Sequence, residues 1–202
     1  MVADREIARL FPSAIQISKI QNAEELNKKL VKSVAKIRKS TPNGRPDSWI
    51  SSVYTTLHTN DKLHLNPEIK DLADIVMDEA KEFGVFLGLN LDLYKLEFKD
   101  FWMNIYGWKD GQEAHLHNNS VISGSYYLKA PAGSSGLVFH SPTMDRMYIP
   151  IFKDTNIYNT DYDELSVEDG VLVLFPSNLK HSVRPSKINK ERISLSFNIV
   201  QI

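Results

Sequence analysis

A two-residue alternation near the C-terminus most limits how this chain can fold. Its polar members are Arg192, Ser194, Ser196 and Asn198. The residues between and after them are isoleucine, leucine and phenylalanine. Successive side chains of a β-strand point to opposite faces, so this pattern predicts a strand with one apolar and one polar face. A polar row on a strand that is otherwise apolar indicates that the strand lines a pocket.

Short apolar runs separated by turn residues fill the rest of the C-terminal half. The sequence predicts strands at 93–106, 121–129, 137–140, 147–152, 171–175, 181–184 and 193–200, with an edge strand at 13–20. Many short strands with turns between them are typical of a sandwich or barrel.

Two amphipathic helices are predicted before these strands, and both should pack against a sheet. Asn22 with Glu25 three residues later suggests a capping box, and the first helix should run to the loop that contains Pro42. The second helix should start at Pro67 and end between Gly84 and Gly88. We expect one domain over 1–202, with helical and edge-strand support in 1–92 and the β core in 93–202.

Composition narrows the classes of function. The 202 residues include 24 basic and 25 acidic side chains, so nucleic-acid binding is not favoured. There is no cysteine, which excludes disulfides and thiolate ligands. No apolar run approaches the length of a membrane span, and the N-terminus has no long apolar stretch behind it. The expected location is the cytoplasm, with no membrane partner.

Three histidines form the candidate metal site. His115 and His117 are two residues apart, so in a strand both rings would enter one cavity. His181 follows the apolar run 171–175, which should hold it rigidly. Neutral imidazole binds Fe, Zn, Cu and Ni, and three protein ligands with open positions are typical of non-haem Fe(II) oxygenases. Arg192 with Ser194 adds a planar fork and a hydroxyl, which suit a bound carboxylate.

These residues resemble the 2-oxoglutarate- and Fe(II)-dependent oxygenases, specifically their prolyl-hydroxylase-like branch. The matching segments are His115-Leu-His117, Ser125-Tyr-Tyr127-Leu-Lys129, Val173-Leu-Phe175-Pro176, His181-Ser-Val183 and Glu191-Arg192-Ile-Ser194. The resemblance covers roughly residues 98–202. It implies a mainly β fold with flanking helices around a double-stranded β-helix core, the cupin-like jelly roll.

The resemblance also implies a ligand for each site residue. Fe(II) would be bound by His115, His117 and His181. Tyr127 and Arg192 would hold the distal carboxylate of 2-oxoglutarate with help from Ser194, while Asn104 and Tyr106 would line the same site. No catalytic residue is implied beyond the metal ligands.

His117 departs from the family pattern, which has aspartate or glutamate at this position. A neutral ligand leaves the metal more electrophilic and can change which metal binds. Three alternatives stay open: a three-histidine site, a carboxylate supplied by Asp110, Glu113 or Asp145, or a chain that keeps the fold without the activity.

The implied function is a dioxygenase that hydroxylates a peptidyl residue or a small molecule and releases succinate and CO2, with ascorbate as a further reductant. Trp108 and His140 are candidate substrate contacts, and the loops 43–52 and 141–170 are candidate recognition segments. The alternatives are a cupin-type metal-binding protein, which also uses His-x-His and a distal histidine, and a non-catalytic jelly-roll binding module. The sequence leaves the substrate and the oligomeric state open.

Overall fold

The computed structural model describes residues 4–143 and 147–202, and two antiparallel β-sheets form its centre. The larger sheet has six strands in the order β1-β8-β5-β10-β3-β2. Their bounds are β1 Gln16–Lys19, β8 Val171–Pro176, β5 Ile122–Lys129, β10 Arg192–Gln201, β3 Leu96–Tyr106 and β2 Tyr54–Thr55. The long strands β3, β5 and β10 therefore lie side by side in the middle of this sheet.

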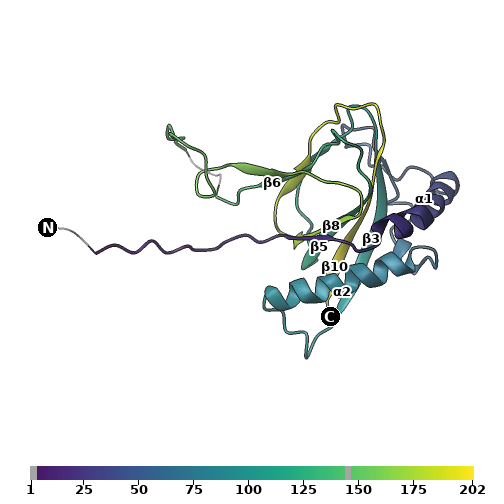
Figure 1. Cartoon of the computed structure of the whole chain (residues 1–202), viewed down its shortest axis with the longest axis horizontal. Helices are drawn as coiled ribbons and strands as arrows, with labels where there is room; N and C mark the ends of the chain where they lie inside the picture. Colours follow the sequence, from purple (N-terminus) through teal and green to yellow (C-terminus); the bar gives the residue numbers. More distant parts are fainter. Residues whose placement is uncertain (1–3, 144–146) are drawn as a thin grey trace.

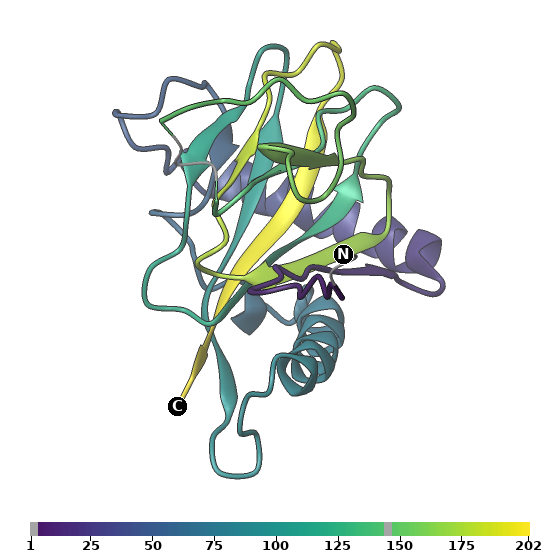
Figure 2. The ribbon, with the colours of Figure 1, turned by 90° about the vertical axis from the view of Figure 1, so that its left-hand side faces the viewer.

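The smaller sheet has four strands in the order β4-β9-β6-β7. Their bounds are β4 Gln112–His115, β9 His181–Val183, β6 Leu137–His140 and β7 Tyr162–Leu165. It faces the larger sheet across the interior, as Figure 2 shows, and the predicted jelly-roll core with flanking helices is confirmed.

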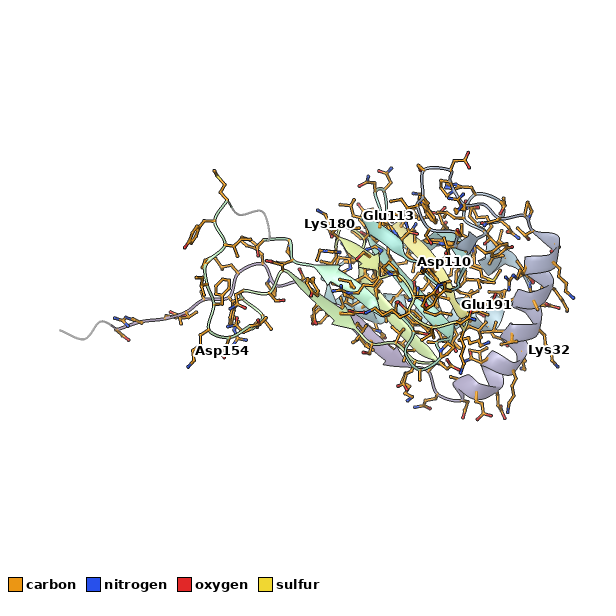
Figure 3. The ribbon with its side chains drawn as sticks, turned by 90° about the horizontal axis from the view of Figure 1, so that it is seen from above. Lys32, Asp110, Glu113, Asp154, Lys180 and Glu191 are labelled. Atoms are coloured by element: carbon orange, nitrogen blue, oxygen red, sulfur yellow. The ribbon has the colours of Figure 1, made fainter. Side chains whose placement is uncertain are left out.

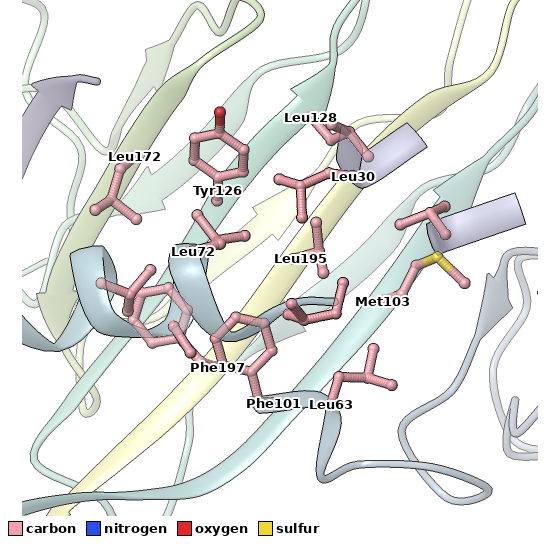
Figure 4. Packing of buried hydrophobic residues seen from close by; sticks show 14 of the residues in the cluster. Leu30, Leu63, Leu72, Phe101, Met103, Tyr126, Leu128, Leu172, Leu195 and Phe197 are labelled. Atoms are coloured by element: carbon pink, nitrogen blue, oxygen red, sulfur yellow. The ribbon is translucent and has the colours of Figure 1, made fainter. Parts of the chain in front are cut away.

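Two helices cover the outer face of the larger sheet (Figure 1). They are α1 Ala23–Ser40 and α2 Lys70–Phe86, and a short 3-10 helix, η1 Leu63–Leu65, precedes α2. Leu30 of α1 and Leu72 of α2 pack with Leu195 and Phe197 of β10 in the larger of two buried clusters (Figure 4). These side chains are at most 1% exposed, so the helices are held chiefly by apolar burial against the sheet.

Asn22 is the N-cap of α1, as predicted, but the capping interaction and the start of the second helix need correction. Asn22 adopts a left-handed conformation, with φ of 55°, and makes no side-chain capping bond, so the capping box does not form. Its carbonyl oxygen instead accepts from the backbone N–H of Glu25. The second helix begins at Lys70 rather than Pro67, because the chain before it forms a separate turn in which Asn66 accepts from the N–H of Glu68.

The strand prediction for 147–152 is wrong. This segment has no strand pairing and belongs to a connection that extends away from the sheets, near the similarly extended N-terminal residues (Figures 1 and 3). Its apolar side chains are exposed, including Met147 and Ile151. The strands β4 and β7 were not predicted, because their residues are mostly polar and exposed and carry no apolar run.

The alternation on β10 has the predicted consequence. Its apolar residues from Ile193 to Ile199 join the cluster beneath the helices, and its polar residues face the interior between the sheets. β10 pairs with β3 on one side and β5 on the other. Ser194, Ser196 and Asn198 therefore each have a partner on both strands, whereas Arg192 is paired with Tyr106 of β3. These rows form the floor of the site.

No helix in the described part of the chain is long and apolar enough to cross a membrane. The division into one domain over 1–202 stays a prediction.

Candidate metal centre and anion pocket

A cavity of about 250 Å³ lies between the two sheets. It is lined by Trp49, Leu57, Trp102, Asn104, Tyr106, Gln112, His115, His117, Asn118, Gly124, Ser125, Tyr127, Leu137, Phe175, His181, Val183, Arg192, Ser194, Ser196 and Asn198. The floor comes from β3, β5 and β10, and the opposite wall comes from β4, β9 and the segments beside them. All eight residues predicted to bind metal or cosubstrate are among these lining residues.

The three predicted histidines lie together at one part of this cavity. His115 on β4 and His181 on β9 are direct cross-strand partners, and their ring centroids are 4.3 Å apart. The ring of His117 is 5.1 Å from that of His115 and 5.0 Å from that of His181. One nitrogen of each ring lies within 4.8 Å of the corresponding nitrogens of the other two, so the three can share one ion.

His117 reaches the cluster differently from the expected way. β4 ends at His115, so the two histidines do not share a strand. The backbone N–H of His117 donates to the carbonyl oxygen of Ser177 at 2.9 Å, and this bond fixes the chain just beyond β4. The spacing of two residues correctly predicted that both rings enter one cavity. The ring of His117 is positioned by the loop contact with Ser177, however, and not by the alternation of a strand.

Burial keeps these imidazoles neutral. Desolvation, with the neighbouring His115 second, lowers the pKa of His117 to about 4. Desolvation, again with His115 second, lowers the pKa of His181 to about 3. Desolvation also lowers the pKa of His115. Because a metal binds unprotonated imidazole, the cluster is ready to bind an ion at neutral pH without first losing protons.

The depressed pKa values predict an acid-sensitive metal-free protein. Below pH 6.5, the ordinary pKa of histidine, these side chains become protonated in the unfolded chain but stay neutral in the folded chain. The stabilisation is therefore complete above pH 6.5 and declines as pH falls toward the folded pKa values. One such histidine should contribute a loss of about 2 kcal/mol between about pH 6.5 and pH 5.

Urea unfolding of the metal-free protein at several pH values measures this loss. His181→Gln removes one of the titrating groups and should flatten the pH dependence of the unfolding free energy. An unchanged slope in this variant would show that other groups cause the acid sensitivity.

Arg192 lies at another part of the cavity and is only 4% exposed. One terminal nitrogen donates to the carbonyl oxygen of Ser135 at 2.6 Å, whereas Nε is buried with no hydrogen-bond partner among the described residues. The neighbouring Glu191 is paired with Arg38 at 2.9 Å, so it does not neutralise Arg192. A buried guanidinium without a carboxylate is costly, and an anionic ligand would satisfy it.

The residues around Arg192 suit a carboxylate. Its guanidinium lies 4.2 Å from the ring centre of Tyr106 and 5.5 Å from that of Tyr127. Desolvation raises the pKa of Tyr127 to about 12, so its hydroxyl stays protonated and able to donate. Ser194, the cross-strand partner of both Asn104 and Tyr127, is buried beside them. Asn104 donates to Ser196 at 3.2 Å, which holds its amide in the floor.

The suggested substitute carboxylates do not join the histidines. Asp110 accepts from the backbone N–H groups of Ser52 and Gly107, and Glu113 accepts from that of Ile50. Both therefore stabilise loops near the cavity (Figure 3), and neither belongs to the metal-ligand cluster found among the described residues. Asp145 lies outside the described residues.

Trp108 and His140 are not among the lining residues of the cavity. Trp108 is 54% exposed, and His140 bonds Ser182 at 2.8 Å on the smaller sheet. Two other tryptophans, Trp49 and Trp102, line the cavity. Trp102 lies 5.9 Å from His117 between ring centres, and Trp49 comes from the predicted recognition loop 43–52. Trp102 is the cross-strand partner of Ser196, a residue of the polar row. This pairing would have placed Trp102 at the cavity, but the sequence does not reveal the strand register.

The donor set fits iron and 2-oxoglutarate. Three neutral imidazoles on one side of an ion leave open positions for an oxygen ligand, and Arg192 offers an unsatisfied donor for the far carboxylate of a small diacid. A jelly roll with these two features defines a non-haem metal enzyme that uses an anionic cosubstrate.

Comparison with known proteins agrees. Residues 100–198 match the model of a family described as "Putative 2OG-Fe(II) oxygenase". A comparison with curated proteins found no significant sequence match. This match supports the predicted superfamily, the 2-oxoglutarate- and Fe(II)-dependent oxygenases.

Solved structures share its fold at low sequence identity. A prolyl-4-hydroxylase from Pseudomonas putida is 16% identical, with 92% of each chain covered and a TM-score of 0.59. A prolyl hydroxylase from Trichoplax adhaerens, solved with a peptide fragment of hypoxia inducible factor, is 15% identical over 92% of this chain and 83% of that one, with a TM-score of 0.65. HygX from Streptomyces hygroscopicus, solved with nickel, 2-oxoglutarate and hygromycin B, is 10% identical over 93% and 83%, with a TM-score of 0.60. The chain thus shares the fold of two prolyl hydroxylases, in agreement with the predicted branch.

Proposed function

We propose that this oxygenase hydroxylates an uncharged, side-chain-sized group of a larger substrate and releases succinate and CO2 from 2-oxoglutarate. One observation carries the proposal: a buried arginine, with no carboxylate partner among the described residues, lines the same cavity as three neutral histidines. A cupin-type metal-binding protein or a binding module would have no need of this buried cation, so those alternatives are not favoured.

Each residue has a defined role in this proposal. His115, His117 and His181 would hold Fe(II), and Arg192 would hold the distal carboxylate of 2-oxoglutarate with Tyr127 and Ser194. Asn104 and Tyr106 would complete the wall of that site. Iron and 2-oxoglutarate supply the oxidising chemistry when bound, while the protein positions them and keeps water away.

The size of the cavity favours a substrate that inserts only one group. Sites that enclose a whole small-molecule ligand are typically about 300–1,000 Å³, and this cavity of about 250 Å³ must also hold the cosubstrate. Most of the substrate would therefore stay outside. A peptidyl residue fits this restriction best, and a small molecule that projects one group into the cavity is the second candidate.

The lining predicts an uncharged target. Arg192 is the one permanently charged side chain among the described lining residues, and it belongs to the cosubstrate site. The remaining walls carry Trp49, Leu57 and Trp102, with the amides of Gln112 and Asn118. Aromatic and aliphatic side chains with a few amides suit an apolar group presented by an amide backbone.

Two further expectations remain proposals: a cytoplasmic location, and ascorbate as a reductant that supports turnover. The oligomeric state stays open. The near balance of basic and acidic residues keeps nucleic acid the less favoured substrate.

Substrate-dependent formation of succinate tests the proposal. The Fe(II)-loaded protein should form succinate from 2-oxoglutarate slowly alone and several-fold faster with a true substrate. The panel should contain proline-containing peptides, matched peptides without proline, free amino acids and small cyclic molecules. Mass spectrometry should find one added oxygen on the stimulating substrate. Failure to consume 2-oxoglutarate with any member, in protein that binds Fe(II), would contradict the proposal.

A further inference from the structure

The three histidines are oriented by two different kinds of partner. Nδ1 of His115 bonds the carbonyl oxygen of Glu113 at 2.7 Å, and Nδ1 of His181 bonds that of Leu179 at 2.9 Å. Both partners are backbone groups two residues earlier in the chain. Nδ1 of His117 instead bonds two side chains, Asn198 and, at 2.9 Å, Ser123. The histidine at the position of the usual carboxylate is thus the one held by a side-chain network.

This network ends at a carboxylate. Nδ2 of Asn198 donates to Oδ2 of Asp100 at 3.1 Å. Because a carboxylate only accepts hydrogen bonds, the amide nitrogen of Asn198 must face Asp100, and its oxygen Oδ1 must face His117. That oxygen in turn requires Nδ1 of His117 to carry the proton, which leaves Nε2 free for a metal. The orientation of His117 therefore depends on Asp100 through one intervening amide.

The strand register assembles the network. Asn198 on β10 is paired with Asp100 on β3 and with Ser123 on β5. The side chain of Asp100 is 16% exposed, Asn198 is 7% exposed and Ser123 is fully buried. Ser123 also donates to Oδ1 of Asn198 at 2.8 Å, so the amide oxygen is held on two sides. Because these groups are buried, the electrostatic effect of each on its hydrogen-bond partner is stronger than it would be in water.

We propose that Asp100, acting through Asn198, supplies the negative charge that this metal site lacks in its first ligand shell. The usual family carboxylate is replaced by His117, and the compensating carboxylate lies two hydrogen bonds away. Asp100 and Asn198 are positioning residues: they orient His117 and increase the electron density at its metal-binding nitrogen. The inference rests on the proposed metal site.

Two lysines lie beside Asp100, and their positive charges partly offset the electrostatic effect of its carboxylate. The distances from Lys62 and Lys99 to the carboxylate are 3.6 Å and 3.8 Å. Their side chains are 49% and 40% exposed, so water and salt screen both pairs. The opposing view is that Asp100 serves only to pair these lysines at the strand. The two views predict different effects on metal binding.

Calorimetric titration of Mn(II) into the metal-free full chain separates the two views. Asp100→Asn keeps the size and an acceptor oxygen but removes the charge, and it should weaken Mn(II) binding roughly 10- to 100-fold. Asp92→Asn, which removes an exposed carboxylate in the turn before β3, is the matched control and should bind as the wild type does. The double variant Asp100→Asn with Asn198→Asp places a carboxylate directly against His117 and should recover most of the affinity.

The outcomes are distinct. Failure of the wild type to bind Mn(II) would overturn the proposed metal site itself. The role of Asp100 alone would be overturned if the wild type and Asp100→Asn bind Mn(II) with equal affinity. It would also be overturned if Asp100→Asn loses affinity for Mn(II) and the double variant does not recover it. If Asp100→Asn does not fold, Lys99→Gln provides the test. Removal of this positive charge beside Asp100 should tighten Mn(II) binding, and unchanged or weaker binding would contradict the inference.

Discussion

Arg192→Ala should weaken 2-oxoglutarate binding to the Mn(II)-loaded protein by at least about tenfold while leaving Mn(II) affinity close to that of the wild type. Arg192 is 4% exposed, and its Nε has no partner within the described chain. Charge-assisted hydrogen bonds to a carboxylate contribute about 1.5–3 kcal/mol each, so loss of even one explains a tenfold effect. Anaerobic calorimetric titration of 2-oxoglutarate measures it directly.

Two further variants sharpen this result. Arg192→Lys keeps the charge but cannot reproduce the planar fork, so its affinity should fall between the wild type and the alanine variant. Arg38→Ala removes the exposed arginine that pairs with Glu191, the neighbour of Arg192, and should not change 2-oxoglutarate binding. Equal binding by the wild type and Arg192→Ala would exclude the anchor role and return the cupin-type alternative to consideration.

His117→Ala should abolish tight metal binding. The remaining two histidines cannot form a facial set of three ligands, so the loss should exceed the roughly 10- to 100-fold effect typical of outer-sphere partners. His115→Ala and His181→Ala should behave alike, because one nitrogen of each histidine belongs to the same cluster. Calorimetry with Mn(II) and thermal unfolding together distinguish loss of the ligand from loss of the fold.

His140→Ala is the matched control for this series. His140 bonds Ser182 and does not line the cavity, so its variant should bind metal as the wild type does. His117→Asp restores the ligand of the usual family pattern and should retain binding. Full metal affinity in His117→Ala would show that the three-histidine site is wrong and that a carboxylate must complete it.

The chemistry of the candidate site was predictable from sequence because it depends on residue types at short spacings. His115 and His117 are two residues apart, and the alternation from Arg192 to Asn198 defines one polar face of a strand. Both patterns reflect the two-residue period of extended backbone, which is a local property. The buried apolar runs on β5, β8 and β10 were found for the same reason, whereas the polar strands β4 and β7 were not.

Contacts between distant segments could not be read from the sequence. The place of Trp102 in the cavity wall is one example, since nothing local to β3 shows which of its faces meets the cavity. The same holds for Asp100 and Asn198, which are 98 residues apart and become partners through the pairing of β3 with β10. Register is set by the packing of whole sheets and helices, so it is a property of the assembled fold.

The sequence by itself thus predicted a sandwich or barrel with flanking helices, and it identified three histidines and an arginine that line one cavity, because periodicity and side-chain chemistry act over a few residues. The jelly-roll class came from the resemblance to a known family. Only the tertiary structure decided that Asp110 and Glu113 stabilise loops, that Trp49 and Trp102 line the cavity, and that the ring of His117 is connected to a carboxylate. Those outcomes depend on cross-strand register and on which faces of two sheets meet, and both arise from the cooperative burial of apolar surface across the entire chain.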